Sequence, residues 1–300
     1  MEEHEMSAAS GDCVYNPDYG MPILDYRGVR WMPPSTRAFV DKVAAFPLDP
    51  SDVIVAAYPK SGTNWLQIMI ANFYDDWGTC TITPHRRVPS LDVEIPNFDF
   101  EGYSSCIAAK IPRLMKTHLP ASAMPDRWFK TRSKIVYITR NPKDVCCSYY
   151  HQVYNANLGL EAGFDLWVDR FCFNRVPWTG WLENVLSWHR YGETDGVLHT
   201  TYEKMRVDPV GEMRRVIKFL GKPVTEERFQ QVVRDARFEN MHSSGLSSQI
   251  NAGLTNDKFM RQGSVGGWRN TLSAAQSAKI DDVIVRPLEA AGVVLSYEQL

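Results

Sequence analysis

The sequence has no dense or paired pattern of cysteines. Its six cysteines are scattered, at positions 13, 80, 106, 146, 147 and 172, with no Cys-x-x-Cys pair and no Cys/His ligand spacing. Small disulfide-stabilised domains and structural zinc sites both require such patterns. We therefore expect reduced thiols and no bound metal.

Long apolar runs and an excess of charge of one sign are also missing. The longest apolar runs, such as residues 53–58, fall far short of the ~20 residues that span a bilayer. The acidic residues 1–6 lack the basic and apolar regions of a signal peptide. The net charge of −2 gives no general attraction to nucleic acid or to an anionic membrane. We expect a cytoplasmic protein that binds neither of them and holds any anion with a local cluster.

What is present is the pattern of an α/β domain. Apolar strand patterns lie at 53–57, 113–117, 134–139 and 197–202. Helical patterns alternate with them, at 63–76, 142–154, 164–173, 181–191, 209–220, 226–234 and 274–290. This alternation favours a central, mostly parallel sheet with helices on both faces.

Three further segments have no such pattern. Residues 1–20 are polar and are expected to form a disordered tail, which leaves residues 21–300 as a single domain. The Pro-rich stretch 85–112 predicts a long loop. The Ser/Gly-rich stretch 240–263 predicts a mobile lid.

One strand-to-helix connection has the features of an anion-binding loop. The strand at 53–57 ends in a turn that contains Lys60, Ser61 and Gly62 and leads into a helix. Such a turn presents free backbone N–H groups and the positive end of the helix dipole, and glycine lets the backbone approach an anion. The lysine precedes the glycine, so the loop is not a Walker A motif. A structural turn with an exposed lysine is the alternative.

A second connection of this kind follows the strand at 134–139. Arg140 stands at the end of that strand, and Ser148 lies about two turns into the next helix. Because the carboxyl ends of parallel strands line one crevice, Arg140 and Lys60 are expected to share it. Two such ends suggest a nucleotide phosphorylated at two places. A salt bridge between Arg140 and Asp144 is the structural alternative.

A third segment supplies a candidate general base. Lys116 and His118 are two residues apart, on the same side of the chain if it is extended. A histidine near its unperturbed pKa accepts a proton at neutral pH, and a lysine beside it neutralises charge on a transferring group. The alternative is a hydrogen-bonded structural histidine.

Together these segments resemble the cytosolic sulfotransferases. The likeness runs from about residue 25 to the C-terminus. Four motifs carry it, in the order and spacing of the family: Tyr58-Pro-Lys-Ser-Gly-Thr-Asn-Trp65, Arg113-Leu-Met-Lys-Thr-His-Leu-Pro120, Arg140-Asn-Pro-Lys-Asp-Val145 with Ser148-Tyr-Tyr-His151, and Phe259-Met-Arg-Gln-Gly263 with Gly267-Trp268. The resemblance implies an α/β domain with a P-loop-like strand-loop-helix that binds phosphosulfate.

The resemblance also implies a donor and its binding residues. The donor would be 3′-phosphoadenosine 5′-phosphosulfate (PAPS), the product 3′,5′-bisphosphoadenosine (PAP), and no metal would be needed. The implied donor-binding residues are Lys60, Ser61, Gly62, Thr63, Asn64, Trp65, Arg140, Ser148, Tyr202, Phe238, Arg261, Gln262 and Gly263. The implied catalytic set is His118 as general base with Lys60, Lys116 and Ser148.

The chain departs from the family pattern at several positions. Gln262 stands where the family commonly has lysine, and Ala236 where it commonly has threonine. The usual C-terminal dimer signature is degraded, with Ala274 and Ala278 in place of its valine and glutamate. A monomer or a weak homodimer is therefore expected.

The acceptor is expected to be a small molecule with a hydroxyl or amine, phenolic or steroid-like, because the candidate pocket is largely apolar. The candidate lining residues are Leu91, Ile95, Phe98, Tyr154, Leu158 and Phe259. Two other functions are alternatives. A variant P-loop kinase is disfavoured, since no strand ends in a magnesium-binding aspartate. A sulfotransferase-like binding protein without turnover has no evident need for His118.

Overall fold

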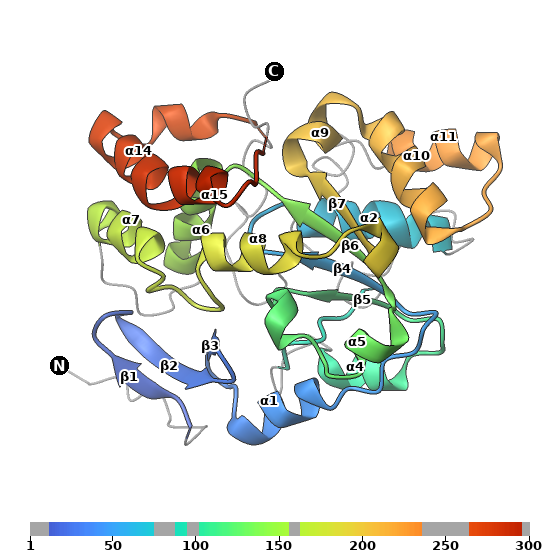
Figure 1. Cartoon of the computed structure of the whole chain (residues 1–300), viewed down its shortest axis with the longest axis horizontal. Helices are drawn as coiled ribbons and strands as arrows, with labels where there is room; N and C mark the ends of the chain where they lie inside the picture. The colour runs from blue at the N-terminus through green and yellow to red at the C-terminus, as the bar shows by residue number, and fades with distance from the viewer. Residues whose placement is uncertain (1–11, 75–87, 95–101, 156–162, 236–263, 296–300) are drawn as a thin grey trace.

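The computed structural model describes residues 12–74, 88–94, 102–155, 163–235 and 264–295. At its centre lies a parallel sheet with the strand order β5-β4-β6-β7 (Figure 1). The strands are β4 (Val53–Ala57), β5 (Leu114–Thr117), β6 (Lys134–Thr139) and β7 (Val197–Thr201). The sequence patterns predict all four strands to within one residue, and the expected α/β fold with a parallel central sheet is confirmed.

Side chains alternate between the two faces of this sheet, and each face has its own core. Ile54 and Ala56 of β4 belong to one core, whereas Val53, Val55 and Ala57 belong to the other. All five residues are buried, which explains why β4 is an unbroken apolar run.

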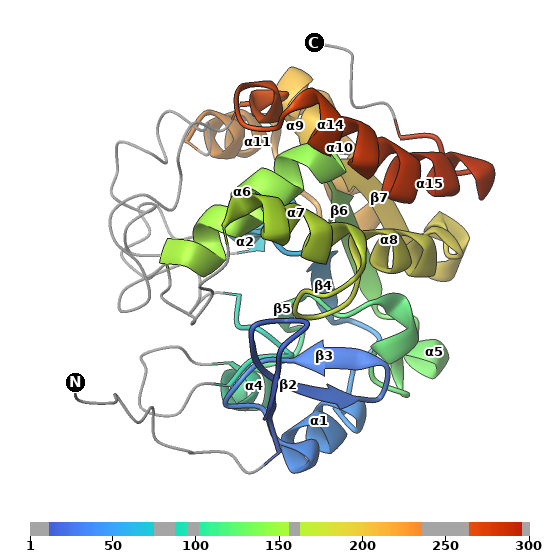
Figure 2. The ribbon, with the colours of Figure 1, turned by 90° about the vertical axis from the view of Figure 1, so that its left-hand side faces the viewer.

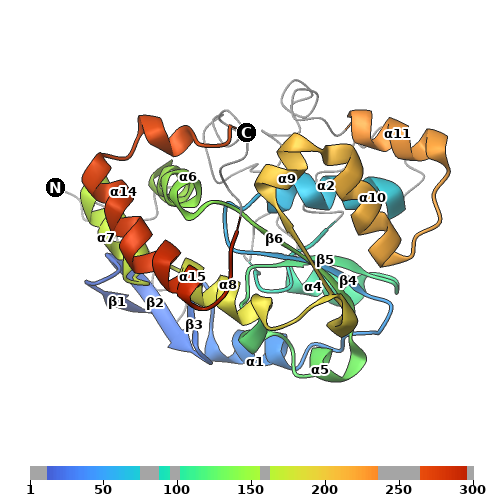
Figure 3. The ribbon, with the colours of Figure 1, turned by 45° about the horizontal axis from the view of Figure 1, so that its top comes forward.

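Helices cover both faces of the sheet (Figure 3). One face carries α2 (Thr63–Tyr74), α9 (Tyr202–Val207), α10 (Pro209–Leu220) and α11 (Glu226–Asp235). The other face carries α6 (Pro142–Asn155), α7 (Phe164–Cys172), α8 (Trp181–His189), α14 (Ala274–Ile280) and α15 (Arg286–Ala290). A π-helical turn, η4 (Asp281–Val285), joins the last two helices, so the predicted helix 274–290 is one run with an internal irregularity. Among the described residues, no helix is long and apolar enough to cross a bilayer.

Local sequence sets where these helices begin and end. In α10, the Asp208 carboxylate accepts a hydrogen bond from the Gly211 N–H at 2.8 Å, and Pro209 occupies the first turn. The helix ends at Gly221, whose φ of +69° is the left-handed conformation that glycine adopts without cost. In α14, Ser273 and Gln276 form a capping box.

A second, antiparallel sheet in the order β1-β2-β3 precedes the parallel one (Figure 2). It consists of β1 (Val14–Asn16), β2 (Met21–Tyr26) and β3 (Val29–Trp31), and α1 (Arg37–Ala44) follows it. Because β1 pairs with the start of β2, the expectation that the disordered tail extends to residue 20 is wrong. Residues 1–11 lie outside the described residues. Trp31 shares a buried core with Ile54, so this sheet is not a separate domain.

The predicted loop 85–112 also contains more structure than its sequence indicates. Residues 103–108 form the helix α4 (Tyr103–Ala108), and Cys106 on this helix is fully buried. Its burial against the core stabilises a turn that has no helical period of its own. The remaining helices of the described ranges are short: η1 (Ala121–Ala123), α5 (Trp128–Thr131), η2 (Glu193–Asp195) and η3 (Gly267–Asn270).

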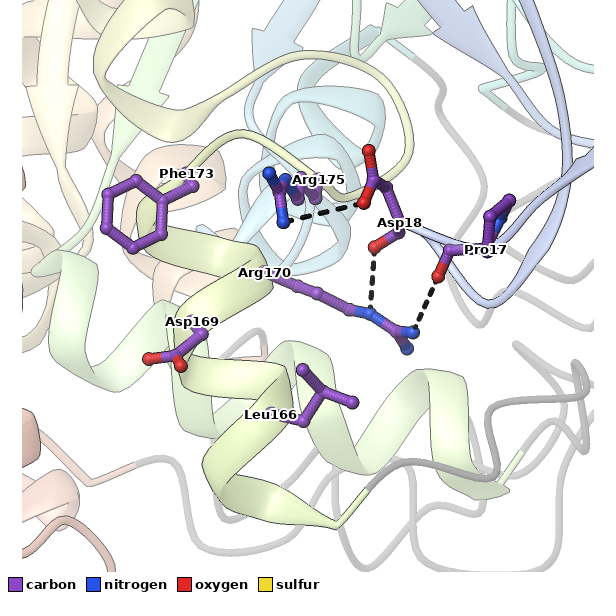
Figure 4. A pocket seen from close by; sticks show the side chains of 7 residues that line it. All are labelled: Pro17, Asp18, Leu166, Asp169, Arg170, Phe173 and Arg175. Atoms are coloured by element: carbon purple, nitrogen blue, oxygen red, sulfur yellow. Dashed lines mark hydrogen bonds and ion pairs between the residues drawn. The ribbon is translucent and has the colours of Figure 1, made fainter.

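Arg170 of α7 fixes the N-terminal hairpin to the rest of the molecule (Figure 4). Its Nε donates to the Asp18 carbonyl at 3.0 Å and its Nη2 to the Pro17 carbonyl at 3.3 Å, and Arg175 pairs with the Asp18 carboxylate at 3.6 Å. A surface pocket of about 390 Å³ lies beside these contacts, lined by Pro17, Asp18, Leu166, Asp169, Arg170, Phe173 and Arg175. None of the predicted site residues lines it.

Candidate active site

The carboxyl ends of the four parallel strands meet at one edge of the sheet. Ala56 of β4 pairs with Thr117 of β5, and Ala57 pairs with Ile138 of β6. On β6, Thr139 pairs with Thr201 of β7. The segments that directly follow these strands carry Lys60, His118, Arg140 and Tyr202.

The turn between β4 and α2 is tight and strained. Lys60 has a φ of +68°, an uncommon conformation for a residue with a side chain, and Gly62 has a φ of +100°. A Cβ on Gly62 would lie 2.7 Å from Cδ2 of Tyr202. Only glycine therefore fits there, and the Gly62 carbonyl accepts the first helical hydrogen bond from Leu66 at 3.2 Å.

Buried polar atoms without a partner lie at this turn and on the neighbouring Arg140. Ser61 Oγ and Thr63 Oγ1 are buried without a hydrogen-bond partner in the described part of the chain, and so is Arg140 Nε. Native proteins satisfy nearly all such atoms, so a group of them at one place calls for a ligand. All three donate hydrogen bonds, and the first two lie at the positive end of α2. This set of donors fits an anion.

Arg140 links the turn to β7 and to the C-terminal part of the chain. Its Nη1 donates to the Lys60 carbonyl at 3.4 Å and its Nη2 to the Ser264 carbonyl at 3.1 Å. Its guanidinium lies 4.4 Å from the centre of the Tyr202 ring. The predicted alternative, a salt bridge to Asp144, exists only as a 4.0 Å contact. Arg140 and the backbone of Lys60 thus come together, as expected for two strand ends at one crevice, and Tyr202 lies beside them.

Trp65 and Tyr202 form an aromatic wall beside this cluster. Their rings meet edge to face, with the centres 5.7 Å apart, and both are more than nine-tenths buried. Asn64, on α2, and Ser148, on α6, are partly exposed.

His118 is held at three points. Its ring Nδ1 lies 2.8 Å from the Ala57 carbonyl. Its backbone N–H donates to the Asp92 carboxylate at 2.6 Å, and its backbone carbonyl accepts from the Asn184 side chain at 3.2 Å. A carbonyl oxygen only accepts, so Nδ1 carries the hydrogen and Nε2 of the neutral ring is the free acceptor. Burial lowers the pKa of His118 below 6.5, and Lys116 and Lys60 lower it further, so the ring is neutral at pH 7.

Lys116 lies on β5, two residues before His118, and is almost fully buried. Burial lowers the pKa of its ammonium from 10.5 to about 8, because a charge is costly to remove from water, while Asp92 opposes this shift. The ammonium is therefore still mostly protonated at pH 7.

Four residues of the site have no signal in the sequence. Asp92 lies in the predicted loop 85–112, Asn184 on α8, and Glu203 directly after Tyr202. Trp178 has a φ of +73° and places its ring 5.7 Å from that of His118, while its backbone pairs with Arg30 through two 2.7 Å hydrogen bonds. A single acid or tryptophan without a motif gives no indication of such placement.

Asp144 is a further structural organiser. Its carboxylate accepts hydrogen bonds from the Gly266 N–H at 2.8 Å and the Trp268 N–H at 3.0 Å. It thereby fixes η3 against α6, shortly after the predicted site residues 261–263.

Some predicted site residues lie outside the described part of the chain. They are residues 261–263, Phe238, the acceptor candidates Ile95, Phe98, Leu158 and Phe259, and the side chain of Tyr154. The remaining acceptor candidate, Leu91, is fully buried in the core.

Glu203 carries a buried carboxyl group whose Oε1 accepts the Asn141 N–H at 3.0 Å. Burial raises its pKa from 4.5 to about 7. The unfolded chain releases this proton near pH 4.5 but the folded chain near pH 7, so stability falls as the pH rises through this window.

Glu203→Gln keeps an acceptor for Asn141 and removes the titration. Relative to the wild type, we expect its free energy of unfolding to gain about 2 kcal/mol between pH 5 and pH 8. Urea unfolding at the two pH values measures this gain, with the exposed Glu227→Gln as the control for loss of a charge. Parallel pH dependence in Glu203→Gln and the wild type would contradict the burial argument.

Comparisons with known proteins point to one family. The family model described as the sulfotransferase domain matches residues 50–292. The chain is 30% identical over 292 residues to sulfotransferase 1A1 of Canis lupus familiaris, covering 92% of this chain and 97% of that protein. It is 28% identical over 290 residues to sulfotransferase 1B1 of Mus musculus, covering 93% of each.

Solved structures show the same fold. Mouse sulfotransferase SULT7A1, crystallised with PAP, superposes with a TM-score of 0.72 at 26% identity, covering 89% of this chain and 95% of that one. Retinol dehydratase, crystallised with androsterone and the inactive cofactor PAP, superposes with a TM-score of 0.76 at 24% identity, covering 90% of each chain. Within the described ranges, no group of three or more His, Cys, Asp or Glu side chains is arranged to hold a metal ion.

Proposed function

Because this chain belongs to the sulfotransferase family, we propose that it transfers a sulfuryl group from PAPS to a small acceptor. The reacting group of the acceptor is a hydroxyl or an amine, on a phenolic or steroid-like molecule. We keep the single domain expected for residues 21–300 and add residues 14–20 to it, since β1 pairs with β2.

The observation that carries this proposal is the group of buried, unpartnered donors at the β4–α2 turn. Ser61, Thr63 and the helix N-terminus would hold the 5′-phosphosulfate together with Lys60. Arg140 and Ser148 would hold the 3′-phosphate. Mouse SULT7A1, which has the same fold, was crystallised with PAP, and this supports PAPS as the donor.

The residues outside the described part have matching roles in the proposal. Arg261 and Gly263, with Gln262 between them, would join Arg140 at the 3′-phosphate. Phe238 would pack on adenine beside the wall of Trp65 and Tyr202.

The catalytic step is assigned to His118 and the two lysines. When bound, the donor supplies an activated sulfuryl group. His118 Nε2 accepts the proton of the acceptor, because its ring is neutral and its Nδ1–H is held by the Ala57 carbonyl. The Lys116 and Lys60 ammonium groups stabilise charge that develops during transfer. Such transfer needs positioning and charge stabilisation more than covalent participation by the protein.

Incubation with radiolabelled PAPS and a panel of phenols, steroids, amines and catechols, with and without EDTA, tests the proposal. We expect labelled product that is insensitive to EDTA. Loss of product with EDTA would contradict the metal-free mechanism. Tight binding of PAP with no product from any acceptor would instead support a binding protein, and transfer from ATP with magnesium a kinase.

A further inference from the structure

Residues 88–92 run beside the outer edge of β5. Ser90 and Lys116 form a parallel bridge, in which the Lys116 N–H donates to the Pro89 carbonyl at 3.0 Å and the Leu91 N–H donates to the Lys116 carbonyl at 2.9 Å. This pairing carries Asp92 to the carboxyl end of β5, where His118 begins the next segment.

The carboxylate of Asp92 is completely buried and accepts three hydrogen bonds. Ser90 Oγ donates to Oδ1 at 2.7 Å, whereas Thr117 Oγ1 and the His118 N–H donate to Oδ2 at 3.0 and 2.6 Å. Burying a carboxylate costs free energy unless its oxygens accept hydrogen bonds. Here the donors are Ser90, Thr117 and the backbone of the proposed base, His118. Asp92 therefore fixes the backbone of His118 at the end of β5.

Asp92 also supplies negative charge to two buried groups. Its charge raises the pKa of both Lys116 and His118, against the effect of burial. The other titratable group that acts on Lys116 is the Cys106 thiol, which burial keeps neutral by raising its pKa. On His118, Lys60 and Lys116 act in the opposite sense to Asp92.

We propose that Asp92 is a positioning residue of the transfer reaction: it orients His118 through the backbone and supplies a negative charge near the buried Lys116. The inference rests on the proposed function. It gives the predicted loop 85–112, which carries candidate acceptor-lining residues, a direct connection to the base and the cation. Asp92 itself acts through these two residues and does not react.

The test is the pH dependence of kcat in Asp92→Asn, which keeps the shape of the side chain and removes its charge. Without Asp92, Lys116 loses its proton at a lower pH. We therefore expect the alkaline limb of the profile to move toward acid, so that kcat at pH 8 falls on the order of tenfold. At pH 6.5 the loss is smaller, and the KM for PAPS changes little.

Two further variants separate charge from structure. Ser90→Ala removes one hydrogen bond from Asp92 but keeps the carboxylate, so its alkaline limb is expected to stay at the wild-type pH whatever its rate. Asp92→Glu keeps the charge and displaces the contact with the His118 N–H, so it should lower kcat without moving the limb. This variant also tests the proposal if Asp92→Asn does not fold.

The results that would contradict this inference differ from those that would contradict the proposed function. A wild-type protein that transfers no sulfuryl group contradicts the function. If the wild type is active and the Asp92→Asn profile is lower at every pH but not shifted, the charge role of Asp92 is contradicted and the proposed function is not. An acid-shifted limb in Asp92→Glu contradicts it as well.

Discussion

Replacement of His118 by alanine is expected to lower kcat by at least ~100-fold and to leave the affinity for PAP nearly unchanged, since a positioned general base contributes on this scale. The ring is held by the Ala57 carbonyl at Nδ1, which leaves Nε2 as the acceptor. Alanine removes that acceptor but none of the groups around Lys60 and Arg140. The loss should therefore fall on the chemical step and not on donor binding.

The pH profile of kcat in the wild type is a second test of the role of His118. Because burial lowers the pKa of His118 below 6.5, the acid limb of kcat should lie below that value. The alkaline limb should lie near pH 8, where Lys116 loses its proton. In His118→Ala the acid limb should disappear and the alkaline limb should remain.

A second partly buried histidine provides the matched control. His199 on β7 also has a lowered pKa and a ring nitrogen 2.8 Å from a backbone carbonyl, that of Tyr191. His199→Gln is expected to keep kcat within about threefold, because its ring contacts Tyr137 and the Tyr191 carbonyl and not the residues of the site. Full activity in His118→Ala, measured with labelled PAPS beside this control, would remove His118 from the mechanism.

The parallel sheet was predictable because its strands are buried on both faces. Runs such as residues 53–57 and 134–139 have few polar residues and end at turn formers, so their boundaries are sharp. The N-terminal sheet was not predictable. The strands β1 and β3 have three residues each, too few to show an alternation, and their pairing depends on contacts that Arg170 and Trp178 make from distant parts of the chain.

The candidate site, too, was predictable from the sequence in part only. Lys60 and Arg140 were predicted to share one crevice because each follows a parallel strand and these strands end at one edge. Asp92 and Glu203 were not predicted, because their importance comes from burial beside these residues. Burial at a sheet edge depends on how separate segments pair, which a single acid in a loop does not indicate.

The tightness of the β4–α2 turn leads to the second large effect. Gly62→Ala is expected to weaken PAP binding on the order of 100-fold. Its φ of +100° is strained for alanine, and the new Cβ would lie 2.7 Å from Tyr202 Cδ2. Strain and overpacking together cost about 2–4 kcal/mol. The turn can relieve this cost only by moving away from the conformation that presents Ser61 and Thr63 to the anion, so the cost appears in binding.

Gly292→Ala isolates the strain from the collision. Gly292 also has a positive φ, +80°, but a Cβ there meets nothing within 4 Å. This variant should lose some thermal stability and bind PAP like the wild type. Calorimetric titration of both variants with PAP, together with their melting temperatures, decides between the two causes. Wild-type affinity in Gly62→Ala would contradict the prediction that this turn must keep its conformation to bind the anion. Weak binding in both variants would point to a general loss of stability, whereas weak binding in Gly62→Ala alone would locate the phosphate site at this turn.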